Sequence, residues 1–228
     1  MNVMSSNITY KYIKQNPDIH TYIKNADAAV EAQGYTEHSF AHVERTASMV
    51  EMILTTLGYD ERTVELGKIA AYLHDIGNVI NRVDHAQSGA IMAFRLLDNL
   101  NMPPEEICTV ISAIGNHDEN TAQPINPISA ALIIADKADV RRSRVRNVST
   151  SETLARDIHD RVNYAVERSE LLFSDDKTAI ILDLAIDSSI SPVMEYFEIF
   201  LQRMLLCRRS AEFLGISFHL RINGSDII

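Results

Sequence analysis

The chain has 228 residues, of which 46% are hydrophobic and 23% charged, and its formal net charge at pH 7 is −10. This length allows a sizeable core, in one large domain or in a main domain with a smaller companion. The negative charge argues against nonspecific binding to nucleic acid, which needs clustered positive charge. No apolar run approaches the roughly 20 residues that span a bilayer, and the N-terminus lacks the apolar stretch of a signal peptide. We therefore expect a cytoplasmic protein without a membrane partner.

Helical patterns dominate the first two thirds of the chain. From Val43 to Leu57, apolar residues recur at spacings of four and three, which is typical of an amphipathic helix over residues 38–57. Residues 1–149 are therefore expected to form a helical domain. Comparable patterns predict further helices over residues 17–33, 61–76, 86–100, 104–117 and 127–139.

The last third of the chain has a different pattern. In residues 178–187, apolar and more polar positions alternate with a period of two, which predicts a half-buried strand. Residues 217–222 alternate in the same way, and one long helix is expected between the two strands. The SDDK at 174–177 is typical of a turn, which would join the first strand to a weaker one around 162–173. We expect a mainly α protein in which residues 150–228 form a small α+β domain.

The two cysteines lie far apart in the sequence. Cys108 and Cys207 each occur within an apolar, helix-like segment. This placement favours two buried thiols in a reducing compartment over a disulfide or a metal site.

Imidazole and carboxylate side chains recur at the edges of the predicted buried helix faces. His74 and Asp75 are adjacent in the last turn of helix 61–76, and both are costly to bury without a partner. A single histidine on an apolar helix face is usually a structural residue. Here, however, each of several histidines and carboxylates would need its own structural explanation, and all of these explanations would have to hold together. Imidazole and carboxylate together suit iron, manganese, zinc, nickel or magnesium. The candidate ligands are His42, His74, Asp75, His85, His117 and Asp136.

Five segments that carry these residues follow one another along the chain: HVERT, YLHDIGN, DHAQSGA, IGNHDE and IIADKAD. They include HxxR at 42–45, LHDIG at 73–77 and HxxxGA at 85–90. In these motifs and in the order of their ligands, residues 30–145 resemble the HD-domain superfamily of metal-dependent phosphohydrolases.

The resemblance implies an HD-type helical bundle with two divalent metal ions. One ion would be held by His42, His74, Asp75 and Asp136, with Asp75 able to bridge to a second ion, whose site His85 and His117 would complete. The identity of the metal stays open among Fe, Mn, Ni, Zn and Mg. The candidate catalytic residues are Asp75, His117 and Asp118.

Several neighbouring residues have more than one interpretation. His38 precedes His42 by one helical turn and could be the first ligand, although the match to HxxR favours His42. Asp118 could be a base near the metals or a carboxylate at a helix end. Arg45 could orient a ligand, neutralise Asp136 or pair at the surface.

The candidate substrate-binding residues are basic. Many relatives have lysine after HDIG, whereas this chain has Asn78, so no lysine–phosphate contact is expected there. Lys137 could supply one, although a surface lysine is the more ordinary interpretation. Arginine forks match phosphate bidentately, or they pair with acidic residues. The candidates are Arg45, Lys137, Arg141 and Arg142, the last two from the run RRSRVR at 141–146.

The leading hypothesis is a phosphatase or phosphodiesterase. Paired metals would supply a bound hydroxide and stabilise charge as it attacks phosphorus in a nucleotide or a small phosphorylated metabolite. One alternative is a di-iron oxygenase, because two branches of the superfamily use this ligand set with two irons. Another is a noncatalytic ligand-sensing or assembly module, in which the C-terminal domain could form a homodimer interface.

Overall fold

The computed structural model describes residues 8–119, 121–146 and 157–227. The chain divides into two compact units, Met1–Ile133 and Ile134–Ile228, and the division falls within helix α7 (Pro127–Ala138). The predicted domain boundary between residues 149 and 150 lies outside the described residues. Over the described ranges, no helix combines the length and the apolar character needed to cross a membrane.

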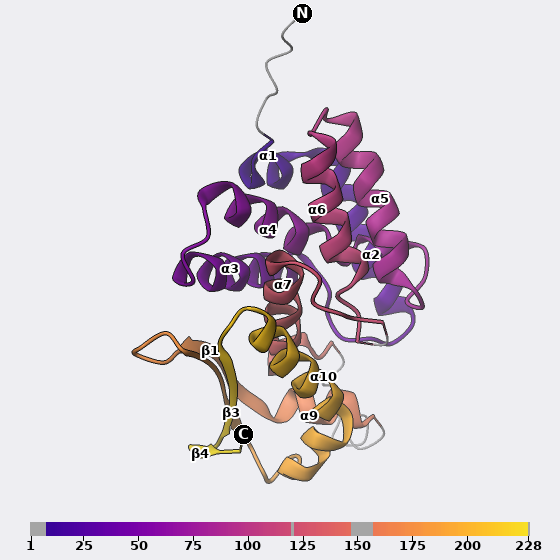
Figure 1. The fold of residues 1–228 in the computed structure, drawn as a ribbon. Helices are drawn as coiled ribbons and strands as arrows, with labels where there is room; N and C mark the ends of the chain where they lie inside the picture. Colours follow the sequence, from indigo (N-terminus) through magenta and orange to yellow (C-terminus); the bar gives the residue numbers. More distant parts are fainter. Residues whose placement is uncertain (1–7, 120, 147–156, 228) are drawn as a thin grey trace, which may run out of the picture. The chain divides into compact units, whose positions relative to one another are not determined.

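The first unit is helical, and the predicted helices are all present in it or in α7 (Figure 1). Helix α3 packs against α4, α5 against α6, and α4 against α6. Its elements before α7 are α1 (Tyr10–Gln15), α2 (Pro17–Ala32), α3 (Phe40–Thr56), α4 (Glu61–Leu73), the 3₁₀ turn η1 (Ile76–Val79), α5 (His85–Asn99) and α6 (Pro104–Gly115).

Local sequence signals explain where these helices begin. The side chain of Asn16 accepts hydrogen bonds from two backbone N–H groups of the first turn of α2, and Pro17 occupies its first position. Asp60 caps α4 and Ser39 caps α3 in the same way. The apolar stripe of α3 is buried, as the spacing predicts.

Two helices that carry predicted ligands end earlier than their apolar pattern suggests. Helix α4 ends at Leu73, so His74 is its C-cap and Asp75 lies beyond it, in front of η1. Helix α6 ends at Gly115, so His117 follows the helix instead of belonging to it, as the expected range of 104–117 implied. The prediction that His74, Asp75 and His117 belong to these helices was therefore wrong. After α4 the chain enters η1, in which Gly77 packs directly against the backbone of α5: a Cβ at Gly77 would lie 2.0 Å from the carbonyl oxygen of His85.

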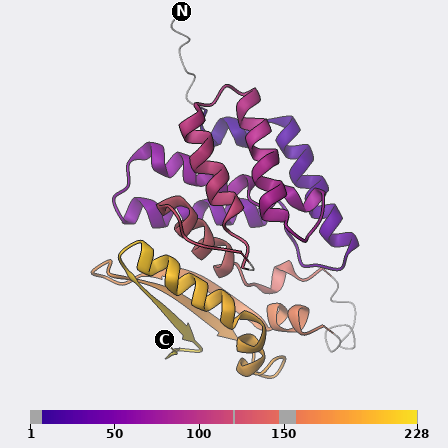
Figure 2. The ribbon, with the colours of Figure 1, turned by 45° about the vertical axis from the view of Figure 1, so that its right-hand side comes forward.

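The second unit contains a four-stranded sheet in the order β1-β2-β3-β4. Strands β1 and β2 are antiparallel, β2 and β3 parallel, and β3 and β4 antiparallel. Figure 2 shows helix α10 lying along one face of this sheet. After the end of α7, the elements of the unit are η2 (Arg142–Arg144), α9 (Ile158–Ala165), β1 (Val166–Phe173), β2 (Ala179–Ile186), α10 (Val193–Phe213), β3 (Ser217–Ile222) and β4 (Ser225–Asp226).

The period-two patterns identified β2 and β3 correctly. Their buried residues pair across the ladder, as Ile180 with Phe218 and Leu182 with Leu220. The weaker strand expected around 162–173 is present as β1 and pairs with β2, but it begins only at Val166, because 158–165 form α9. The start of α9 is determined locally, by the Asp157 side chain, which accepts hydrogen bonds from the first backbone N–H groups of the helix.

The prediction of two buried thiols holds for one cysteine. Cys207 is buried on α10, whereas Cys108 is exposed. Cys108 follows the buried Ile107 directly on α6, and neighbouring positions of a helix point in different directions. The mainly α fold with a small C-terminal sheet is confirmed.

Candidate metal centre

Five of the six predicted ligands are buried together in the first unit. His42 comes from α3, His74 and Asp75 follow α4, His85 begins α5, and His117 follows α6. The exposed fraction of each residue is 5% or less. Five polar side chains that are buried together need hydrogen-bond partners or metal ions, because burying an unpaired polar group is costly.

The four histidines form two pairs that face each other through their Nε2 atoms. The Nε2 atoms of His42 and His74 are 3.3 Å apart, and those of His85 and His117 are 3.2 Å apart. The rings of His74 and His117 meet edge to face with centroids 4.9 Å apart, so the two pairs are neighbours.

Backbone carbonyl groups determine which ring nitrogen is available in three of these histidines. The Nδ1 atoms of His74, His85 and His117 lie 2.7, 3.0 and 2.6 Å from carbonyl oxygens. A carbonyl oxygen only accepts, so each Nδ1 donates its proton and the neutral ring presents a lone pair at Nε2. His85 and His117 then turn two lone pairs toward each other, and this contact requires a proton or a metal ion between them.

Asp75 faces both histidine pairs. Its Oδ2 atom lies 3.2 Å from Nε2 of His74 and 3.5 Å from Nε2 of His42, and its Oδ1 atom lies 3.5 Å from Nε2 of His85. One carboxylate oxygen is therefore directed to each pair, as in a bridging ligand. Burial alone would raise the pKa of Asp75. When the neighbouring rings are protonated, the charges of His74 and His38 and hydrogen bonds from His42 and His74 hold that pKa well below its usual range, and metal ions would take the place of these protons.

The pKa of His85 is lowered, which favours the neutral form of its ring. Burial is the main cause of the lowered pKa, and the nearby charge of Arg82 adds to it, although Asp75 and Asp118 act in the opposite direction. A neutral imidazole is the form that binds a metal ion.

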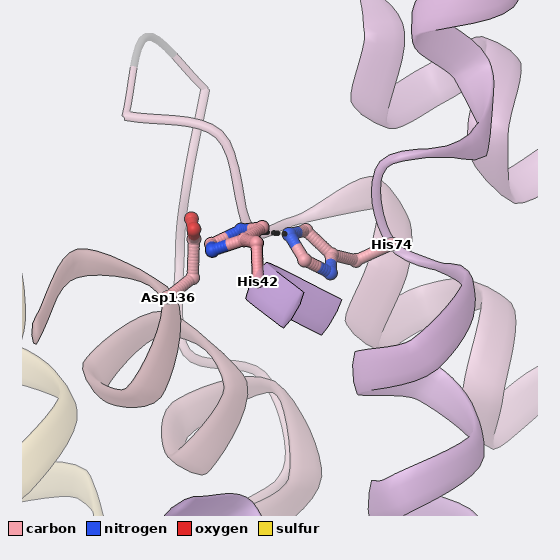
Figure 3. A group of neighbouring side chains, drawn as sticks. All are labelled: His42, His74 and Asp136. Atoms are coloured by element: carbon pink, nitrogen blue, oxygen red, sulfur yellow. Dashed lines mark hydrogen bonds between the residues drawn. The ribbon is translucent and has the colours of Figure 1, made fainter. Parts of the chain in front are cut away.

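Two overlapping groups of side chains could hold metal ions. Figure 3 shows the first, in which one ligand atom from each of His42, His74 and Asp136 lies within 4.8 Å of the others. His74, Asp75 and His117 form the second group by the same distance. Asp136 belongs to α7, the helix within which the two units divide, and is half-buried.

Two side chains next to Asp75 were not among the predicted site residues. The amide of Asn78 donates hydrogen bonds to Oδ1 and to the backbone carbonyl oxygen of Asp75, both at 2.9 Å. Arg82 donates from Nη1 to Oδ1 of Asn78 at 3.1 Å, and the same Nη1 lies 3.8 Å from Oδ1 of Asp75. The sequence marked Asn78 by its position directly after HDIG, and Arg82 by its position three residues before His85.

The remaining predicted residues near the centre have defined surroundings. Lys137 is buried, with its ammonium 2.7 Å from Oδ2 of Asp136, so its interpretation as a surface lysine was wrong; the carboxylate beside it compensates its burial. Arg45 and Asp118 are half-buried. His38 is buried and donates from Nδ1 to a carbonyl oxygen at 2.7 Å, and it belongs to neither ligand group.

The arginines after α7 have partners within the second unit. Arg141 donates from Nε to Oδ1 of Asp139 at 2.9 Å. Arg142 donates to the carbonyl oxygen of Tyr164 at 2.6 Å and stacks its guanidinium over that ring. These contacts match the structural interpretation of the arginine run, and a role in phosphate binding stays a prediction.

This chain is similar to one known domain family and to two known proteins. Residues 39–142 match the model of the HD domain. An uncharacterized protein of Methanocaldococcus jannaschii is 24% identical over 190 residues, which cover 74% of this chain and 72% of that protein. A crystal structure of a "predicted HD superfamily hydrolase" from an uncultured Thermotogales bacterium is 25% identical, with a TM-score of 0.43 over 54% of this chain and 67% of that one. The segment that matches the family model includes all six predicted ligands, and the chain therefore contains an HD domain at residues 39–142.

Proposed function

We propose that this protein is a metal-dependent phosphohydrolase, which hydrolyses a phosphoester of a nucleotide or of a small phosphorylated metabolite with two divalent metal ions. The observation that carries the proposal is the position of Asp75, whose two oxygens are directed to two separate histidine pairs. A site for one ion needs no such carboxylate between two pairs of imidazoles.

The donor set fits divalent transition metals. His42, His74 and Asp136 would hold one ion, His85 and His117 the other, and Asp75 would bridge them. The Nδ1–H bonds to backbone carbonyls hold the rings in orientation and make Nε2 the more basic donor. Metal ions bound here would polarise a phosphoryl oxygen and lower the pKa of a water molecule toward neutrality. Asp118, next to His117, is the candidate base that would take up a proton during hydrolysis.

The first test is the metal content of the purified protein, measured by mass spectrometry without added chelator. We expect about two ions per chain and hydrolysis of phosphomonoesters or phosphodiesters that stops on chelation. A panel with p-nitrophenyl phosphate, bis(p-nitrophenyl) phosphate, deoxynucleotides and cyclic nucleotides would identify the substrate class. A high iron content with a strict requirement for oxygen would support an oxygenase instead. No bound metal, and none taken up from manganese, nickel or iron, would favour a sensing or assembly role.

Replacing His117 with alanine is expected to empty only one of the two metal positions. The variant removes one member of the His85–His117 pair and leaves His42, His74 and Asp75 in place. Metal content should fall from about two ions to about one per chain. The exposed His20 provides the control, since H20A should keep the wild-type stoichiometry. Unchanged stoichiometry in H117A would contradict a second metal position at His117.

A further inference from the structure

The segment between η1 and α5 places an arginine at the edge of the candidate metal centre. The side chain of Arg82 is 22% exposed, so its guanidinium is reached by solvent. Its Nη1 atom is 3.8 Å from Oδ1 of Asp75, the oxygen that faces His85. The backbone carbonyl of Arg82 accepts the Nδ1 proton of His85, so the two residues are also linked through the main chain.

Within the described part of the chain, the guanidinium of Arg82 has few partners. It donates one hydrogen bond, to Oδ1 of Asn78, and lies over the ring of Tyr35 with its carbon 5.7 Å from the centroid. The distance to Asp75 is too long for a hydrogen bond. An arginine carries five N–H donors, so most of them remain for solvent or for a ligand.

Asn78 holds this arginine in its position. Its side chain is fully buried, and it donates to Asp75 while accepting from Arg82. The chain thus has a buried amide at the position after HDIG and a positive charge four residues later. The ring of Tyr35, which is 46% exposed, also contacts the guanidinium through a cation–π interaction.

We propose that Arg82 binds a phosphoryl oxygen of the substrate at the His85 side of the metal centre, with Asn78 as its positioning residue. This inference rests on the proposed phosphohydrolase function. A guanidinium fork matches phosphate oxygens bidentately, and this fork lies beside Asp75, where metal ions would hold a phosphoryl group. An anion bound there would be neutralised by Arg82 on one side and by the metal ions on the other.

The test is the affinity of the metal-loaded protein for inorganic phosphate, measured by isothermal titration calorimetry. R82A is expected to weaken the binding of phosphate by about 10- to 100-fold, because the variant loses a charge-assisted hydrogen bond to the anion. R82K, which keeps the charge without the fork, should recover part of the affinity. The matched control is R95A, which removes an exposed arginine of α5.

Metal content and thermal stability separate this role from a structural one. R82A should keep its metal ions and its melting temperature, and should raise KM for a phosphoester more than it lowers kcat. N78A should weaken phosphate binding as R82A does, and the double variant should be little weaker than either single one. Equal phosphate affinity in the wild type and R82A would overturn the role of Arg82 and leave the phosphohydrolase standing. A metal-loaded wild type that neither binds phosphate nor hydrolyses a phosphoester would overturn both.

Discussion

Replacing Asp75 with asparagine is expected to remove the metal ions and the activity while leaving the helical fold in place. One oxygen of Asp75 is directed to each histidine pair, so in this variant the charge is lost from both positions at once. An amide has the same shape as a carboxylate but supplies only a neutral oxygen and cannot bridge two cations. Several kcal/mol of transition-state stabilisation depend on such metal ions, so hydrolysis should fall by about 10³-fold or more.

The measurement combines metal content by mass spectrometry with far-ultraviolet circular dichroism. Asp84 offers a matched control in the same segment, because D84N makes the same chemical change at an exposed site. Its backbone is left-handed, with φ of 56°, and asparagine tolerates that conformation. D84N should keep its metal ions and turnover. A D75N variant with full metal content would show that the centre lies elsewhere.

A second large effect is expected from replacing Gly77 with alanine. The added Cβ would lie 2.0 Å from the carbonyl oxygen of His85 and 2.4 Å from the backbone nitrogen of Gly89. Backbone atoms cannot rotate away as a flexible side chain can, so η1 and the start of α5 would have to separate. That movement would pull Asp75 and His85 apart, because Gly77 follows Asp75 by two residues.

For G77A we expect a loss of stability of about 3 kcal/mol or more, at the upper end of overpacking effects, together with loss of metal. In a protein of this size that corresponds to a melting temperature lower by about 6–12 °C. Gly115 at the end of α6 is the control, since its added Cβ would meet only the side chain of Ala90, at 3.6 Å. G115A should keep the metal and the melting temperature, and a G77A variant as stable as G115A would contradict the close packing.

The sequence determined the elements whose signals are local. The stripe of α3, the caps at Asn16 and Asp60 and the alternation of β2 and β3 each depend on residues within a few positions of one another. The candidate ligands could also be found from the sequence, because imidazoles and carboxylates at buried positions are costly unless they are partnered. Their order along the chain was sufficient to indicate an HD domain, which the match over residues 39–142 supports.

Only the tertiary structure decided how these residues meet. Each histidine pair joins residues 32 positions apart, and Asp75, which faces both pairs, lies two residues before the point where Gly77 packs onto the backbone of α5. Helical periodicity continued through His74 and to His117, whereas the chain leaves the helix before both residues, after Leu73 in α4 and after Gly115 in α6. The places of Asn78 and Arg82 beside Asp75 follow from the path of the chain after α4. Periodicity records which face of an element is apolar, and it contains no information about which distant backbone will approach it.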